Sequence, residues 1–161
     1  MSDPYERMKT SGIDLPPPPR PAGSYAPGKI YGSLVFASGQ TPTRDGVPAY
    51  RGRLGADLGV DEGYAAARLA ALNCLAELEA VCGDLRRVQS ILKVNGYVAA
   101  SEGFEEQPAV INGASDLLQE IFGDAGVHAR TAIGSNLCRV VRRSRLSSWL
   151  PRALSQGGCD E

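Results

Sequence analysis

Arg130 is the residue of this chain whose surroundings most clearly indicate binding chemistry. It lies in the run Ala129-Arg130-Thr131-Ala132, which has the composition of a β-strand. A guanidinium on a strand can hold a carboxylate through two parallel hydrogen bonds. A salt bridge to a helix carboxylate would instead make Arg130 a structural residue. The residue types alone leave both roles open.

Two other polar groups lie in the first third of the chain. Tyr25 follows Gly23-Ser24, and its hydroxyl could contact a ligand or simply reach solvent from a half-buried strand. Ser38-Gly39-Gln40 follows a β-prone run. Its glycine allows the backbone to pass close to a ligand, and Ser38 or Gln40 could orient a water molecule or the loop beneath it.

Asn112 and His128 are weaker candidates. Asn112 lies inside a predicted helix, where an amide normally faces solvent or bonds locally, so we expect it to line a site or an interface between subunits. His128 is the only histidine, and no cysteine or carboxylate stands at nucleophile or ligand spacing from it. We expect His128 to be a loop residue rather than a general base.

The composition predicts one globular domain with a substantial core, since 161 residues contain 43% hydrophobic and 22% charged residues. A net charge of −1 argues against nucleic acid as a partner. We find no run of apolar residues long enough to cross a membrane and no apolar leader, and therefore expect a cytoplasmic protein without membrane contact. The four cysteines lack CxxC spacing, which argues against structural zinc, and Cys74 and Cys82 are expected to be core residues.

The first predicted element is a β-hairpin, with strands over Tyr25–Ile30 and Leu34–Ser38 and a turn at Gly32-Ser33. The glycine-rich stretch Pro42–Leu58 predicts a long loop with one short strand.

Two helices follow. The first is predicted from Glu62 to Val81, with Asp61 as its N-cap and Gly83 after its end. The second is predicted over Gln107–Phe122. Each has an apolar stripe at helical spacing and is expected to pack on a sheet.

β-branched and aromatic residues predict two more strands, Val88–Val98 and Ala129–Gly134. The order of elements predicts an α+β fold with two helices packed on one face of a mixed sheet. The other face would expose residues such as Val35, Ile91 and Tyr97, or their alternates, which favours self-association.

We divide the chain into three segments. Residues 1–22 are expected to be an extended arm, because the run Leu15–Pro21 is rich in proline. An SH3-type partner is the alternative interpretation of that run. Residues 23–135 form the predicted domain, and residues 136–161 form an Arg- and Ser-rich segment.

Three motifs together resemble the signature of the RidA/YjgF family, also called the endoribonuclease L-PSP family. They are Gly23-Ser24-Tyr25, Ser38-Gly39-Gln40-Thr41-Pro42 and His128-Ala129-Arg130-Thr131-Ala132. The resemblance covers roughly Leu15 to Gly134. It implies the chorismate mutase-like fold and a homotrimer with an active site in each cleft between subunits.

The resemblance also implies roles for individual residues. Arg130 matches the carboxylate-binding arginine of the family, Tyr25 a tyrosine that faces the substrate, and Asn112 an asparagine of the second helix. Ser38 and Gln40 match the turn at the strand end. Arg130 and Tyr25 are therefore expected to be catalytic, and all five residues to bind substrate.

The resemblance stops after about Ser135. Similar chains continue with a strand such as Val-Glu-Val-Glu, one glutamate of which positions the attacking water. This chain has no glutamate between Glu120 and Glu161, and Arg145 stands where the carboxylate is expected. A shifted reading frame near Asn136 and a diverged tail with another role are both open. The arginine-rich run would in most proteins be a solvated face, with a basic docking surface as the alternative.

Three functions follow from these observations. The first is an enamine or imine deaminase that converts 2-imino or 2-aminoacrylate-type acids to 2-keto acids and ammonium, without metal or organic cofactor and impaired by loss of the glutamate. The second is a non-catalytic trimer that binds a small carboxylate or keto acid as a sensor or as a biosynthetic accessory protein. The third is the ribonuclease activity in the name of the family, against which the net charge argues.

Overall fold

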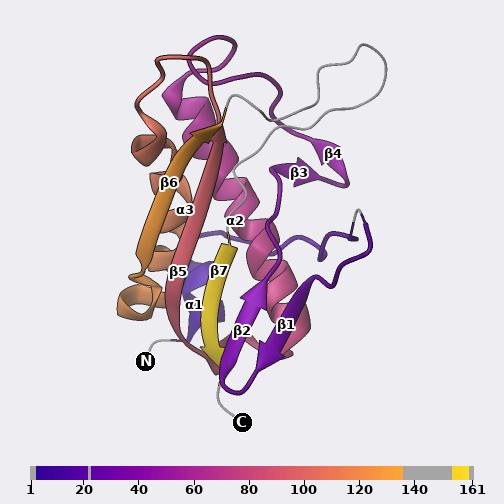
Figure 1. The fold of residues 1–161 in the computed structure, drawn as a ribbon. Coiled ribbons are helices and arrows are strands. Elements are labelled where there is room, and N and C mark those ends of the chain that lie inside the picture. Colours follow the sequence, from indigo (N-terminus) through magenta and orange to yellow (C-terminus); the bar gives the residue numbers. More distant parts are fainter. Residues whose placement is uncertain (1–2, 22, 136–153, 160–161) are drawn as a thin grey trace.

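A five-stranded mixed sheet is the centre of the fold (Figure 1). The computed structural model describes residues 3–21, 23–135 and 154–159. The strands are β1 (Gly28–Tyr31), β2 (Leu34–Ala37), β5 (Val88–Ala99), β6 (Ala129–Ser135) and β7 (Leu154–Cys159). Their order in the sheet is β1-β2-β7-β5-β6, with β5 and β6 parallel and the other pairs antiparallel.

Two long helices, α2 (Val60–Cys82) and α3 (Gln107–Phe122), cover one face of this sheet (Figure 1). Both predicted helices are confirmed, and so is the α+β class. The two helices lie unusually close, because a Cβ atom at Gly113 of α3 would overlap the backbone carbonyl of Tyr64 in α2. Glycine at this position allows the helices to share one core.

The start of α2 differs from the prediction. Its N-cap is Gly59 rather than Asp61, and the Glu62 carboxylate accepts a hydrogen bond of 2.9 Å from the Gly59 amide. Asp61 instead lies in the first turn, where a negative charge stabilises the helix dipole. The end is as predicted, since Gly83 adopts a left-handed conformation with φ of 80°.

A short N-terminal helix, α1 (Pro4–Thr10), contradicts the prediction that residues 1–22 are extended throughout. Met8 of α1 is only 5% exposed and joins the core. The Tyr5 hydroxyl donates to Glu79 of α2 at 2.7 Å and accepts from the Leu85 amide at 3.0 Å. Burial, together with the bond to Glu79, raises the pKa of Tyr5 to about 12.

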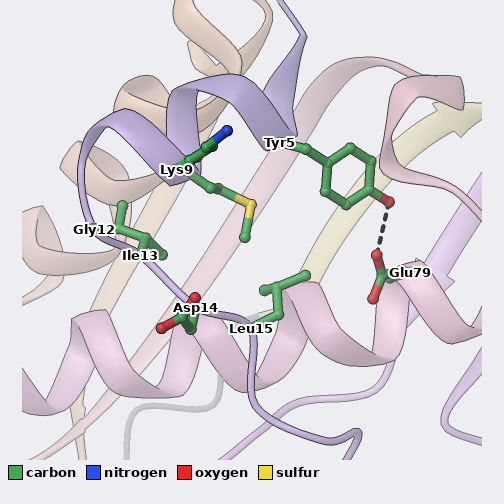
Figure 2. A pocket seen from close by; sticks show the side chains of 8 residues that line it. Tyr5, Lys9, Gly12, Ile13, Asp14, Leu15 and Glu79 are labelled. Carbon is green, nitrogen blue, oxygen red and sulfur yellow. Dashed lines mark hydrogen bonds between the residues drawn. The ribbon is translucent and has the colours of Figure 1, made fainter.

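Figure 2 shows how α1 and the turn after it lie over α2. They leave a pocket of about 340 Å³, which Tyr5, Lys9, Asp14 and Glu79 line together with apolar residues. The proline-rich run beyond it contains no helix or strand, as predicted.

The face of the sheet that the helices leave uncovered exposes the sequence neighbours of Val35 and Ile91. Val35 and Ile91 are 0% and 1% exposed and face the helices, so of the two alternatives left open by the sequence, their neighbours are the exposed residues. Side chains alternate along a strand. The neighbours Phe36 and Leu92 therefore point the other way and are 40% and 44% exposed.

The first strand of the hairpin is shorter than predicted, whereas the loop after the hairpin contains two short strands rather than one. The first strand begins at Gly28, so Tyr25 lies in the segment before it. The loop over 42–58 contains a small hairpin of β3 (Thr43–Arg44) and β4 (Val47–Pro48). Asp45 and Gly46 form its turn with φ of 52° and 75°, as expected for a two-residue hairpin turn.

The C-terminal segment contributes to the sheet through β7, which lies between β2 and β5. The backbone of Gly157 is paired with Val35 on one side and Ile91 on the other. Arg145 and the other arginines of the predicted basic run lie outside the described residues. No helix in the described part of the chain is both long and apolar enough to cross a membrane.

Candidate functional site

Arg130 faces the helical layer because of its register in the sheet. It is paired with Val94 of the parallel neighbour β5. Paired residues of parallel strands lie on the same face, and Val94 is 1% exposed beneath the helices. The Arg130 side chain therefore meets α3 at the outer edge of the sheet.

Two neutral oxygens of α3 hold one nitrogen of the Arg130 guanidinium. Nη1 donates to Asn112 Oδ1 at 2.7 Å and to Ser115 Oγ at 3.1 Å. Asn112 and Ser115 are three residues apart and thus neighbours on one side of the helix. Among the described residues Arg130 forms no ion pair, so the salt bridge considered from the sequence is not found there.

His128 extends this cluster into the protein. Its Nε2 lies 3.1 Å from Ser115 Oγ and its Nδ1 lies 2.6 Å from the carbonyl oxygen of Gly126. His128 does lie in the connection before β6, as predicted. The partner that we missed is Ser115, which comes from α3 and is recognisable in the sequence only by its i+3 spacing from Asn112.

Tyr25 and Ser38 lie together at the opposite edge of the sheet. The Ser38 hydroxyl donates to the Ala26 carbonyl at 2.6 Å, and the Ser38 amide donates to the Pro27 carbonyl at 2.7 Å. Both bonds tie the segment that carries Tyr25 to the end of β2. Tyr25 itself is 49% exposed.

Gln40 is buried, with an exposed fraction of 6%, so its side chain does not share the surface with Tyr25. It lies beside Glu77 of α2, which is 0% exposed. Neither oxygen of Glu77 has a hydrogen-bond partner among the described residues. Burial raises the pKa of Glu77 to about 7, and the nearby Gln40 amide opposes that shift in part. Nothing in the sequence distinguishes Glu77 from the other charged residues of α2, because only packing shows that it is buried among apolar neighbours.

The two halves of the expected site lie at opposite edges of one subunit (Figure 1). Tyr25 and Ser38 adjoin β1 and β2, whereas Arg130 and Asn112 lie at β6. Four interstrand steps of about 4.8 Å separate β1 from β6 and place them about 19 Å apart. The subunit therefore brings Arg130 to Asn112 and Tyr25 to Ser38, but it does not bring the two pairs together.

The described residues contain no cluster of His, Cys, Asp and Glu that could hold a metal ion. Cys74 and Cys82 are buried in the core, as predicted. Burial raises the pKa of the Cys74 thiol to about 12, so this thiol is neither a nucleophile nor a metal ligand at neutral pH.

Comparisons with known proteins agree with this fold over almost the whole chain. Protein TCP17 of Trypanosoma cruzi is 44% identical over 128 residues, which cover 79% of this chain and 80% of that protein. The crystal structure of a "putative endoribonuclease" from Shewanella oneidensis is 38% identical with a TM-score of 0.88, covering 98% of this chain and 99% of that chain.

Atu1372 of Agrobacterium tumefaciens, a protein of unknown function, is 35% identical with a TM-score of 0.82. The match covers 98% of this chain and 94% of Atu1372. The family model described as "YjgF/chorismate mutase-like, putative endoribonuclease" matches residues 5–142. The match begins in α1 and continues past β6. This chain belongs to the YjgF/chorismate mutase-like family.

Proposed function

We propose that this protein binds small 2-imino and 2-keto acids by their carboxylate at Arg130. We further propose that it hydrolyses the imino acids to 2-keto acids and ammonium. The proposal rests on which nitrogens of the Arg130 guanidinium are already hydrogen-bonded. Nη1 is held by Asn112 and Ser115, and Nε and Nη2 have no partner among the described residues. A carboxylate can accept two parallel hydrogen bonds from that pair of nitrogens.

The reaction needs few groups from the protein. A protonated imine is electrophilic at carbon, so a water oxygen bonds to that carbon while the C=N electron pair moves to nitrogen. The added water loses a proton and the nitrogen gains one. The hydroxyl oxygen then forms the C=O bond of the keto acid and loses its proton as the C–N bond breaks, and the released ammonia takes up a proton to become ammonium. These steps balance without a metal or organic cofactor. Arg130 contributes by fixing the acid so that water attacks one face.

Tyr25 would join Arg130 only from a neighbouring copy, because about 19 Å separates the edge strands of one subunit. We therefore propose a homotrimer with a site in each cleft between subunits. The apolar residues of the uncovered face support the association. They include Tyr31, Phe36, Leu92 and Ile133, which are 80%, 40%, 44% and 47% exposed.

The five predicted site residues would have different roles in such a cleft. Arg130 would bind the carboxylate and Asn112 would hold the guanidinium, as it does in this structure. Tyr25 would orient substrate or water, and Ser38 would fix the segment that carries Tyr25. Gln40 is 6% exposed and would support the turn from inside the subunit.

The alternative function is binding without turnover. Among the described residues no carboxylate is hydrogen-bonded to Arg130, Asn112 or Ser115. The position expected for the water-orienting glutamate is occupied by Arg145 in the sequence. Such a protein would serve as a keto-acid sensor or as an accessory protein in biosynthesis. A cytoplasmic location stays a prediction from the sequence.

A trapping assay separates the two functions. An amino acid oxidase generates 2-iminopropanoate from alanine in the presence of semicarbazide, which converts the free imine to a semicarbazone. A deaminase lowers the rate of semicarbazone formation in proportion to its concentration, and Arg130→Ala abolishes the effect. If pyruvate binds but the rate does not change, the protein binds without turnover. Cleavage of RNA that Arg130→Ala does not alter would instead favour the endoribonuclease in the name of the family.

A further inference from the structure

A chain of hydrogen bonds runs from Arg130 through Ser115 and His128 into the corner between α3 and β6. It comprises Arg130 Nη1 to Ser115 Oγ at 3.1 Å, Ser115 Oγ to His128 Nε2 at 3.1 Å, and His128 Nδ1 to the Gly126 carbonyl at 2.6 Å. The binding of a carboxylate by Arg130 does not by itself require Ser115 or His128.

The chemistry of the partners sets the direction of the two outer bonds in this chain, and the tautomer of His128 sets that of the bond between Ser115 and His128. A guanidinium can only donate, so Ser115 Oγ is the acceptor for Arg130. A backbone carbonyl can only accept, so His128 Nδ1 carries a hydrogen and donates to Gly126. In the neutral ring Nε2 is then an acceptor, and it receives the hydroxyl hydrogen of Ser115. With this tautomer the Ser115 hydroxyl donates to His128 and accepts from Arg130 at the same time, so its hydrogen has a partner that points it away from the guanidinium.

The elements that carry the chain are held firmly. Ser115 is 7% exposed in the middle of α3. Gly126 ends the short helix η2 (Gly123–Gly126), and a Cβ atom there would overlap the carbonyl of Leu118 in α3. Because the carbonyl that anchors His128 belongs to this tight contact, the imidazole has a fixed point from which to orient Ser115.

We propose that Ser115 and His128 are positioning residues that aim the Arg130 guanidinium at the substrate carboxylate. This inference rests on the proposed function. Asn112 and Ser115 hold Nη1 through uncharged oxygens, so no carboxylate among the described residues neutralises the positive charge of Arg130. A carboxylate in their place would orient the guanidinium equally well but would compete with the carboxylate of the substrate.

The tautomer can be tested first, without any ligand. His128 is the only histidine in the sequence, so the untagged protein labelled with ¹⁵N-histidine has a single imidazole to observe. Long-range ¹H–¹⁵N correlation spectra at pH 7.5 are expected to show hydrogen on Nδ1 and an acceptor nitrogen at Nε2. Hydrogen on Nε2 instead would overturn the proposed chain.

Pyruvate is the probe for the positioning role, with its Kd measured by calorimetry. Ser115→Ala and His128→Ala are each expected to weaken pyruvate binding roughly 5- to 20-fold, because each removes one link behind a charged hydrogen bond. Ser115→Thr keeps the hydroxyl and His128→Gln keeps an acceptor of similar reach. Both are expected to bind pyruvate with a Kd within about threefold of that of the unsubstituted protein. A general packing defect would weaken binding in these variants as well. Ser33→Ala, in the exposed β1–β2 turn, is the matched control.

The outcomes separate this inference from the proposed function. If the unsubstituted protein binds pyruvate, Arg130→Ala does not, and the Ser115 and His128 alanine variants match the unsubstituted protein, the positioning role alone is overturned. If neither the unsubstituted protein nor Arg130→Ala binds pyruvate, the proposed function fails and the positioning role fails with it. Thermal melting identifies any variant that is unfolded, and for that position the Thr or Gln variant decides.

Discussion

Glu77 provides a test of how strongly the interior of this fold acts on a charge. Its carboxyl group is 0% exposed and has no hydrogen-bond partner in the described part of the chain. Burial raises its pKa from an ordinary value of 4.5 to about 7. Between these two values the unfolded chain has released the proton that the folded chain still holds. The native state therefore loses stability as the pH rises through this window.

The size of the effect follows from proton linkage. A pKa of 4.5 in the unfolded chain and about 7 in the folded chain lowers the free energy of unfolding by about 1 kcal/mol at pH 5 and by about 3 kcal/mol at pH 8.5. The difference between the two pH values is about 2 to 3 kcal/mol. Glu77→Gln has nearly the same shape and no ionisation, so this pH dependence should disappear in the variant.

The assay is urea denaturation of both proteins at pH 5, 6, 7 and 8.5 at one protein concentration. The free energy of unfolding of Glu77→Gln minus that of the unsubstituted protein should rise by about 2 to 3 kcal/mol between the extremes. Every other titrating group is common to both proteins and cancels in this difference. Glu79→Gln, two residues further along α2 and hydrogen-bonded to Tyr5, is the control. A difference that stays constant with pH would show that Glu77 is hydrated or paired, and would refute the reasoning.

Four further predictions concern the site and its assembly. Arg130→Lys keeps the charge but loses the planar fork, and calorimetry should show pyruvate binding about 10- to 100-fold weaker. Phe36→Asp, on the uncovered face, should yield smaller particles in light scattering than Val47→Asp, which alters a 54% exposed residue of the β3–β4 hairpin. Gly113→Ala should lower the free energy of unfolding by about 1–3 kcal/mol in urea titrations, because a methyl group has no space beside Tyr64. Arg145→Glu should raise imine hydrolysis by about 10²–10⁴-fold in the trapping assay if this position is that of the water-orienting carboxylate. An unchanged rate would contradict that alignment.

The sequence by itself determined the elements that depend on local pattern. The helical spacing of apolar residues predicted α2 and α3, and β-branched runs predicted β2, β5 and β6. The motifs around Tyr25, Ser38 and Arg130 indicated the family that the comparisons establish. These features could be predicted because each rests on residues within one short segment.

Residues that touch across the fold could not be predicted in this way. No local pattern pairs Ser115 with His128, and they meet because α3 packs over β6 in one register. The helix α1 is too short for a clear period and is stabilised by its contacts with Glu79 and Leu85.

The order of the strands had the largest consequence for the site. Local sequence predicted the strands near Tyr25 and Arg130, but only the tertiary structure placed them at opposite edges of the sheet. Likewise, the alternation of Val35 and Phe36 showed that one would be buried, and only packing against α2 and α3 decided which one. Strand order and the buried face depend on long-range pairing and on the total apolar surface removed from water, which no short segment contains.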